Sequence, residues 1–190
     1  MPQEEELGKD LFATLLSSTE TPLPIAKPLP LTMEDVRRFS GYDFEVLVAA
    51  IEKRSGKKVI LTPQSGDSGI DVISLTGREL RLIQCKHTQW NGKVDADVVA
   101  EVITALDGYR AKYLRQFGQR VNFCAVLMTN GEFTKSARTK ARDGVEILNG
   151  DDLQKMLLTT QITQRDISEM RDARCSSMRD LPTALAALLG

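Results

Sequence analysis

Residues 65–86 read SGDSGIDVISLTGRELRLIQCK, and this stretch decides the fold. Two runs rich in β-branched and other apolar residues, about 70–76 and 79–86, flank the pair Gly77-Arg78. Glycine in the first position of a two-residue loop favours a type II′ turn, whose twist matches that of paired strands. The stretch therefore predicts a β-hairpin that follows a glycine-rich loop.

A two-residue loop also fixes the register of this hairpin. Thr76 then opposes Glu79, and Asp71 opposes Gln84 near the open end. Directly opposed residues project from the same face, and Lys86 shares that face because it lies two positions beyond Gln84. We therefore expect Asp71, Gln84 and Lys86 to converge. The alternative is structural, in which Asp71 caps the loop and Lys86 extends its ammonium into water at a strand end.

A carboxylate, an amide oxygen and an ammonium group form a chemically informative set. Burying such groups is costly unless they are compensated. Oxygen ligands suit Mg²⁺, and a nearby cation orients water and offsets the charge that develops on a phosphate during hydrolysis. The arrangement favours phosphodiester hydrolysis.

The remaining pattern predicts an α/β fold with a central mixed β-sheet flanked by helices. A helix containing Phe44 to Ile51 precedes a short strand at 59–61. After the hairpin we expect a helix at about 95–116, a buried strand at 121–128, a turn at 130–131, a helix from Thr134, a strand at 145–148 and a helix capped near Asp151 or Asp152. Antiparallel strands followed by α–β alternation are typical of a mixed sheet.

Four segments are expected along the chain. Residues 1–20 form an N-terminal arm, 21–31 a proline-rich linker, 32–159 the main domain and 160–190 a helical appendage in which Pro182 breaks the helix. The apolar end, residues 184–190, is expected to pack on its own domain; a contact between copies and a cut in a longer chain are the alternatives.

The composition excludes several classes of protein. The chain has 190 residues, one histidine, three cysteines and no long apolar run, so disulfide-rich, zinc-binding and membrane-spanning proteins are disfavoured and a cytoplasmic location is expected. The formal charge of −1 hides a local excess, because residues 134–142 contain four basic residues and no acidic one. Nucleic-acid binding and a merely solvated helix face both explain that segment.

Four motifs together resemble a known family. Phe44-Glu45-Val46-Leu47-Val48, the Ser65 to Ile73 stretch, Ile83-Gln84-Cys85-Lys86-His87 and Thr129-Asn130-Gly131-Glu132-Phe133-Thr134 are similar to the Mrr-type restriction endonuclease domain, a branch of the PD-(D/E)xK nuclease superfamily. The resemblance runs from about residue 39 to 158 and implies a restriction-endonuclease-like core.

The resemblance also implies roles for particular residues. Asp71 matches the metal-binding aspartate, Gln84 stands where the superfamily usually has glutamate, Lys86 matches the catalytic lysine, and Glu45 completes the acidic cluster. Because an amide is a weaker ligand than a carboxylate, Glu45 gains importance for holding Mg²⁺.

DNA contacts are expected on the basic helix and on the glycine-rich loop. Spacing of three and four places Lys135, Arg138 and Arg142 on one helical face that opens at Thr134, where free N–H groups also favour phosphate. Gln64 and Ser65 on the loop are further candidates for contact with the DNA backbone. The second basic set is Arg110, Lys112 and Arg115.

The resulting functional prediction is an Mg²⁺-dependent DNA endonuclease, with Mn²⁺ as a substitute, acting as the effector of a prokaryotic restriction or anti-phage defence system. Cutting both strands of a duplex ordinarily needs two sites, so a homodimer or higher oligomer is expected, with the C-terminal appendage as one route of contact. The alternative, based on Gln84, is a catalytically weakened DNA-binding or assembly module on the same fold.

Overall fold

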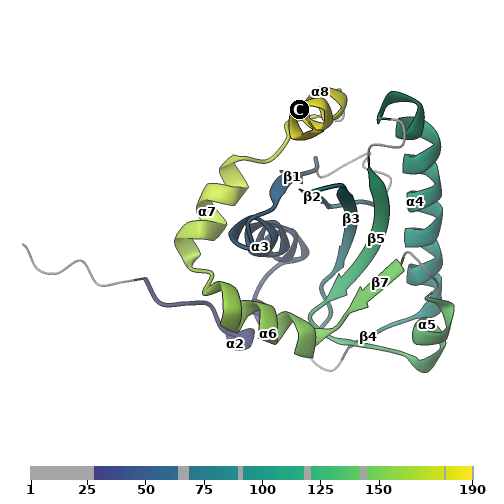
Figure 1. Ribbon diagram of the computed structural model, residues 1–190. Helices are drawn as coiled ribbons and strands as arrows, with labels where there is room; N and C mark the ends of the chain where they lie inside the picture. Colours follow the sequence, from purple (N-terminus) through teal and green to yellow (C-terminus); the bar gives the residue numbers. More distant parts are fainter. Residues whose placement is uncertain are drawn as a thin grey trace, which may run out of the picture.

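A five-stranded sheet forms the centre of the protein. The computed structural model describes residues 28–63, 69–89, 92–117, 121–141, 145–177 and 179–189. The strands are β1 (Lys58–Leu61), β2 (Val72–Thr76), β3 (Glu79–Lys86), β5 (Asn122–Thr129) and β7 (Val145–Leu148), in the order β1-β2-β3-β5-β7. The pairs β1/β2 and β2/β3 are antiparallel, whereas β3/β5 and β5/β7 are parallel (Figure 1). The mixed sheet is confirmed.

The hairpin between β2 and β3 has the predicted register over the paired strands. Thr76 pairs with Glu79, and the ladder continues to Val72 opposite Ile83. Gly77 has a φ of 55°. Arg78 has a negative φ, because Gln161 is the one non-glycine residue with a positive φ in the described ranges. Positive φ at the first loop position alone is the pattern of a type II′ turn.

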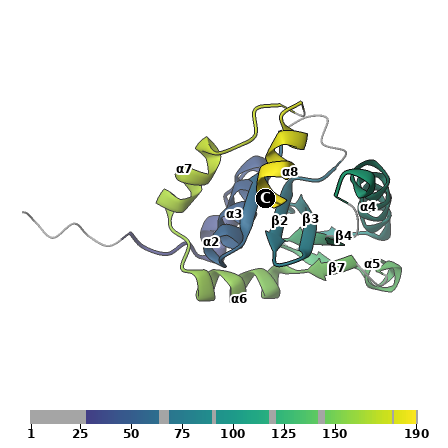
Figure 2. The ribbon, with the colours of Figure 1, turned by 45° about the horizontal axis from the view of Figure 1, so that its top comes forward.

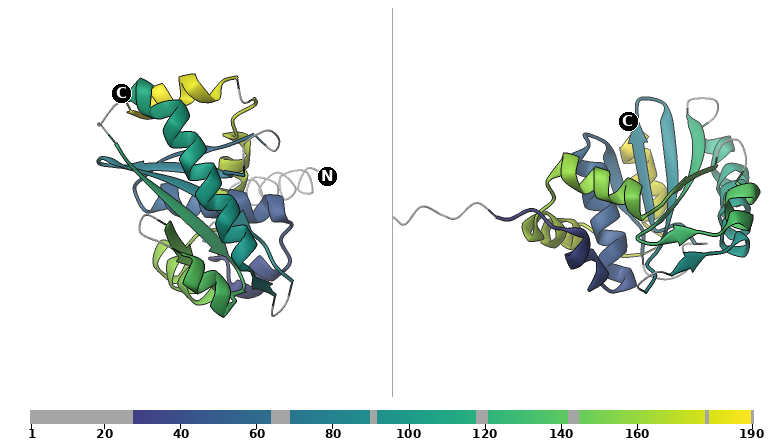
Figure 3. Two further views of the ribbon diagram at one scale, coloured as in Figure 1. Left: turned by 90° about the vertical axis from the view of Figure 1, so that its right-hand side faces the viewer. Right: turned by 90° about the horizontal axis from the view of Figure 1, so that it is seen from below.

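Helices cover both faces of the sheet. α3 (Gly41–Arg54) lies on one face and the long α4 (Ala96–Phe117) lies across the other, as Figure 1 and the left view of Figure 3 show. Phe44, Leu47 and Ile51 of α3 are fully buried against Ile83 and other residues of the sheet. The α4 side has its own core, to which the helix contributes Val99, Val102 and Leu106. The sheet is therefore buried on both sides, in agreement with its apolar parallel strands.

Shorter helices complete the two outer layers. α2 (Met33–Arg37), α6 (Gly150–Thr160) and α7 (Gln164–Asp172) pack on the α3 side, and α5 (Lys135–Lys140) packs on the α4 side (Figure 2). α8 (Leu181–Leu189) buries three leucines in the core of the α4 side, namely Leu181, Leu185 and Leu188. The apolar end of the appendage thus packs within the chain, as expected.

Several details of the local structure differ from the sequence-based expectations. Asn149 caps α6, because its side chain accepts from the N–H of Asp152 while the Asp152 carboxylate accepts from the N–H of Asn149. Either aspartate was predicted as the cap, but Asp152 is the third residue of that capping box. α7 ends at Asp172, well before Pro182, and this proline lies in the first turn of α8, where its missing N–H costs nothing.

The short helix α2 and a two-stranded parallel sheet were not predicted. Thr32 caps α2. The small sheet consists of β4 (Lys93–Val94) and β6 (Glu132–Phe133). Two residues are too few to show an alternating apolar pattern, so this pair leaves no periodic signal in the sequence. In the described part of the chain, no helix is both long enough and apolar enough to span a bilayer.

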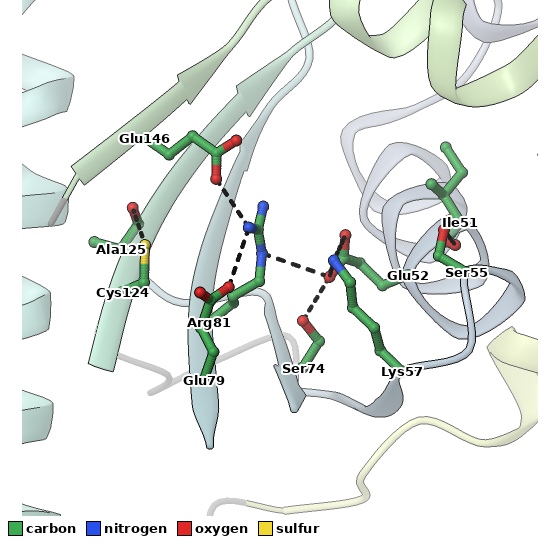
Figure 4. A network of polar contacts seen from close by, with 10 residues as sticks. All are labelled: Ile51, Glu52, Ser55, Lys57, Ser74, Glu79, Arg81, Cys124, Ala125 and Glu146. Atoms are coloured by element: carbon green, nitrogen blue, oxygen red, sulfur yellow. Dashed lines mark hydrogen bonds and ion pairs between the residues drawn. The ribbon is translucent and has the colours of Figure 1, made fainter. Parts of the chain in front are cut away.

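A buried charged network fastens α3 to the sheet (Figure 4). Glu52 is fully buried and accepts a hydrogen bond from Ser74 and an ion pair of 2.9 Å from Lys57. Arg81 Nε lies 3.7 Å from the same carboxylate, and its Nη1 lies 2.9 Å from Glu146 on β7. A buried carboxylate requires such compensation, and the network thereby fixes α3 relative to three strands.

Candidate active site

Asp71 lies immediately before β2, where the chain leaves the ladder. Its N–H donates to the carbonyl oxygen of Ile83 at 2.9 Å. The predicted partner was Gln84, so the observed backbone contact is shifted by one residue along β3. The carboxylate Oδ2 of Asp71 accepts a hydrogen bond of 2.6 Å from the N–H of Cys85. The carboxylate therefore replaces the backbone acceptor that a longer β2 would have offered to β3. This contact places Asp71 beside β3, between Gln84 and Lys86.

Gln84 is buried, with 7% of its surface exposed. Gly69 lies over its amide, because a Cβ built on that glycine would be 3.5 Å from Gln84 Nε2. Gly69 also has a φ of 78°, which glycine adopts without strain. Among the described residues, no donor bonds the buried Oε1 of Gln84. An unsatisfied buried acceptor is costly, and a cation ligated by this oxygen would remove the cost.

Lys86 is the last residue of β3 and is partly exposed. Its carbonyl oxygen accepts a hydrogen bond of 2.7 Å from Thr129, the buried final residue of the neighbouring parallel strand β5. Within the described ranges, no side chain hydrogen-bonds or ion-pairs with its ammonium. Alternation along β3 puts Lys86 on the same face as Gln84. The backbone is fixed while the charged end remains available.

Glu45 lies on α3 and is half-buried. Its Oε2 accepts a hydrogen bond of 2.6 Å from Nη2 of Arg174, which follows α7. The Arg174 guanidinium also lies over the ring of Tyr42, 4.5 Å from its centroid. Sequence reasoning missed Arg174, because nothing in its local sequence indicates a contact with the first half of the domain.

The two carboxylates share one electrostatic environment. Burial raises the pKa of the Cys85 thiol well above its usual value, and the negative charges of Asp71 and Glu45 raise it further, whereas the positive charge of Arg174 opposes them. Cys85 packs with the core on the α3 side, as expected for a residue between Gln84 and Lys86. Cys85 lies on the opposite face of β3 from Gln84 and Lys86, so this shift shows that both carboxylates lie near Cys85 and does not bring Glu45 together with Gln84 or Lys86.

The donor set fits a hard divalent cation in part. Such ions prefer carboxylate and amide oxygens, which Asp71 and Gln84 supply. In the part of the chain that the structure describes, no three His, Cys, Asp or Glu side chains gather as a metal cluster. Asp71 and Glu45 contribute two carboxylates, and Arg174 already bonds Oε2 of Glu45.

The sequence comparison decides the family. Residues 36–157 match the pattern of the restriction endonuclease family Mrr_cat, which is more than half of the chain. The chain belongs to the Mrr_cat restriction endonuclease family. No curated protein matches it.

Solved restriction endonucleases share the fold of this Mrr_cat domain. MspJI, solved in complex with a 27-mer oligonucleotide, is 19% identical with a TM-score of 0.55, and the alignment covers 81% of this chain and 38% of MspJI. AspBHI, a DNA modification-dependent restriction endonuclease, is 17% identical with a TM-score of 0.51, covering 76% of this chain and 40% of AspBHI. The chain thus spans less than half the length of either enzyme.

The residues of the Mrr_cat domain that were predicted to bind DNA lie only in part within the described residues. α5 has six residues and ends at Lys140, after which Ala141 is extended. Lys135 and Arg138 lie on α5, whereas Arg142 lies outside the described residues, so the shared face of these three residues stays a prediction. Gln64 and Ser65 also lie outside them. So short a helix provides no N-terminal phosphate site, and the DNA contacts stay predictions.

Two of the three cations of α5 differ in availability. Arg138 forms an ion pair of 2.8 Å with Glu132, whereas Lys135 is exposed. Arg110, from the second basic set, donates to the carbonyl oxygen of Phe123 at 3.0 Å. Phe123 pairs with Leu80, six positions before Lys86 on β3, which is about 20 Å along the strand. Arg110 therefore lies toward the opposite end of the sheet from Lys86.

Proposed function

We propose that this protein is a metal-dependent DNA endonuclease with its active site at the open end of the β2/β3 hairpin. The observation that carries the proposal is the contact of 2.6 Å between the Asp71 carboxylate and the N–H of Cys85. It fixes the carboxylate at the backbone of the residue between Gln84 and Lys86; among the described residues, Gln84 Oε1 has no donor and the Lys86 ammonium has no side-chain partner. Membership in a restriction endonuclease family supports hydrolysis of a phosphodiester over other uses of this set.

Each residue has a distinct proposed role. Asp71 and Gln84 hold Mg²⁺ or Mn²⁺, and Glu45 completes the ligand set. A divalent ion held by these residues would supply positive charge at the scissile phosphate and would lower the pKa of a bound water molecule. The Lys86 ammonium orients the attacking water by hydrogen bonding and stabilises the negative charge that develops on the phosphate oxygens. Thr129 positions Lys86 by bonding its backbone carbonyl.

DNA is the proposed substrate, because MspJI was solved with an oligonucleotide and AspBHI is a DNA modification-dependent enzyme. Cleavage of both strands needs two sites, so we propose a homodimer or higher oligomer. The buried leucines of α8 are already used within the chain, which argues against these leucines as the contact. A role in cytoplasmic restriction or anti-phage defence follows from the same proposal.

Two observations favour a second candidate, a catalytically weakened DNA-binding or assembly module. Gln84 replaces the usual carboxylate with a weaker ligand, and Arg174 neutralises Glu45 at 2.6 Å. Both features lower the expected affinity for a divalent cation. The presence of Asp71 and Lys86 supports the nuclease. A module that only binds DNA has no chemical need for a metal-binding aspartate or a catalytic lysine.

Cleavage of plasmid and linear DNA by the purified protein tests the nuclease. Supercoiled and linear substrates are incubated with Mg²⁺, with Mn²⁺ and with EDTA, and products are followed on gels. We expect cleavage only with metal, and none from Lys86→Ala, which keeps the described backbone contacts. Efficient cleavage in EDTA would exclude the mechanism, and DNA binding without cleavage under every condition would support the second candidate.

A further inference from the structure

Arg174 is a buried cation that bonds Glu45 of α3, and it lies outside the residues matched to the family pattern. Its side chain is 11% exposed, and the Glu45 side chain is 23% exposed. Among the described residues, Nη2 is bonded to Glu45, whereas Nε and Nη1 are buried without an acceptor. The guanidinium thus satisfies one of its three nitrogen positions while it is largely removed from water.

The segment that carries Arg174 is anchored at two neighbouring points. Arg171, one turn earlier, forms an ion pair of 2.6 Å with Asp43 at the start of α3. The N–H of Cys175 donates to the carbonyl oxygen of Leu61 at 3.0 Å, and Leu61 is the last residue of β1. The next residue, Thr62, bonds the carbonyl oxygen of Asp71. Arg174 is therefore held between α3 and the strand that supports Asp71.

The position of Arg174 conflicts with metal binding at Glu45. A divalent cation ligated by Glu45 would lie close to a guanidinium that is shielded from water, where like charges repel strongly. The two orphaned nitrogens make the present position of the guanidinium costly, because each buried donor without an acceptor is unfavourable. If the guanidinium left Glu45, both nitrogens would bond to water or phosphate oxygens. This gain lowers the cost of replacing Arg174 by a metal ion at Glu45.

We propose that Arg174 is an internal competitor of the divalent metal: Arg174 holds Oε2 of Glu45 in the metal-free protein, and the metal has to displace it to use that oxygen. The proposal rests on the proposed function, since it takes Glu45 as a metal ligand. Arg174 then sets the metal concentration at which the site becomes active. Bound DNA favours the metal-filled site if its phosphates accept hydrogen bonds from the Arg174 guanidinium after that group has left Glu45.

Mn²⁺ binding to the full chain, measured by calorimetry and by electron paramagnetic resonance without DNA, tests the competition. Arg174→Gln should bind Mn²⁺ roughly tenfold or more tightly than the original protein, which corresponds to the loss of one charge-assisted hydrogen bond. Arg171→Gln is the matched control, because it removes the neighbouring ion pair and leaves Glu45 bonded. Its Mn²⁺ affinity should stay within about twofold of the original.

The background of Glu45→Gln separates competition from general repulsion. There, Arg174→Gln should change Mn²⁺ affinity by much less than in the original protein, because the carboxylate under competition is gone. An equal gain in both backgrounds would overturn the proposal, and so would weaker binding by Arg174→Gln, which would make Arg174 a positioning residue. Absence of Mn²⁺ binding by every variant, including Arg174→Gln, would also overturn it.

A second variant guards against a folding defect. Arg174→Lys keeps a positive charge with a single compact head group, so its Mn²⁺ affinity should fall between the original and Arg174→Gln. Thermal melting of each variant identifies any that fail to fold, and Arg174→Lys then decides: affinity unchanged or weaker than the original contradicts the competition. Plasmid cleavage is scored separately, so tighter Mn²⁺ binding without cleavage rejects the nuclease and keeps the competition.

Discussion

Replacing Asp71 with alanine should cost stability as well as activity. The carboxylate accepts the Cys85 N–H at 2.6 Å, and truncation leaves that donor without its acceptor. Hydrogen bonds to charged groups contribute about 1.5–3 kcal/mol, and both residues are partly exposed, which favours the lower half of that range. We therefore expect Asp71→Ala to lower the free energy of unfolding by about 2 kcal/mol. For a protein of this size that corresponds to a melting temperature lower by about 4–8 °C.

Two matched variants make the measurement specific. Asp71→Asn keeps an acceptor oxygen and loses the charge, so it should cost about 1 kcal/mol. Lys86→Ala removes an ammonium that bonds to no described side chain, and its unfolding free energy should change by less than about 0.5 kcal/mol. Urea unfolding and thermal melting give these values, and all three variants should lose cleavage. If Asp71→Ala unfolds like the original protein, or if Lys86→Ala is destabilised as much, the assignment of the hydrogen bond is wrong.

Three further predictions use other parts of the structure. Gln84→Glu should tighten Mn²⁺ binding in calorimetry, because it replaces an amide ligand by a carboxylate; unchanged affinity would show that Gln84 is not a ligand. Lys135→Gln should flatten the salt dependence of DNA binding by about one log–log unit, and Arg138→Gln should do so less, because its guanidinium is already ion-paired; equal slopes from anisotropy titrations would refute this. Burial alone would raise the pKa of Asp43, but its hydrogen bonds and the Arg171 guanidinium hold it below the usual value, so its stabilisation is present at neutral pH and is lost as pH falls through the folded-state pKa. Asp43→Asn should therefore cost about 1 kcal/mol at pH 7 and progressively less toward pH 3, and a cost independent of pH would contradict the shift.

The main parts of the fold were predictable because their signals are local. Gly77 specifies the turn, and the turn fixes the β2/β3 register for every pair from Thr76 to Val72. After the hairpin, the order of the main helices and strands was also predicted correctly, from the alternation of α and β segments and from Thr134 as the residue that opens α5. These features depend on backbone preferences of neighbouring residues, which a single sequence displays directly.

The candidate site was predictable only in part. Asp71 and Gln84 were expected to oppose each other, but the chain leaves the ladder at Val72 and Asp71 uses its side chain on β3 instead. A ladder end depends on where the preceding loop must go, and the hydrophobic pattern does not contain that information. The pairing of Glu45 with Arg174 depends on how α7 packs against α3, so no spacing rule within either helix reveals it.

The contacts that close the appendage onto the domain also have consequences for the rate of folding. Arg171 with Asp43, Arg174 with Glu45 and Lys58 with Leu188 join residues 128, 129 and 130 positions apart. The β2/β3 hairpin closes across two residues, whereas these contacts require most of the chain to be ordered first, and non-local contacts form slowly. We expect the sheet to form before Arg174 reaches Glu45. Variants that weaken these late contacts should therefore accelerate unfolding while leaving the folding rate nearly unchanged.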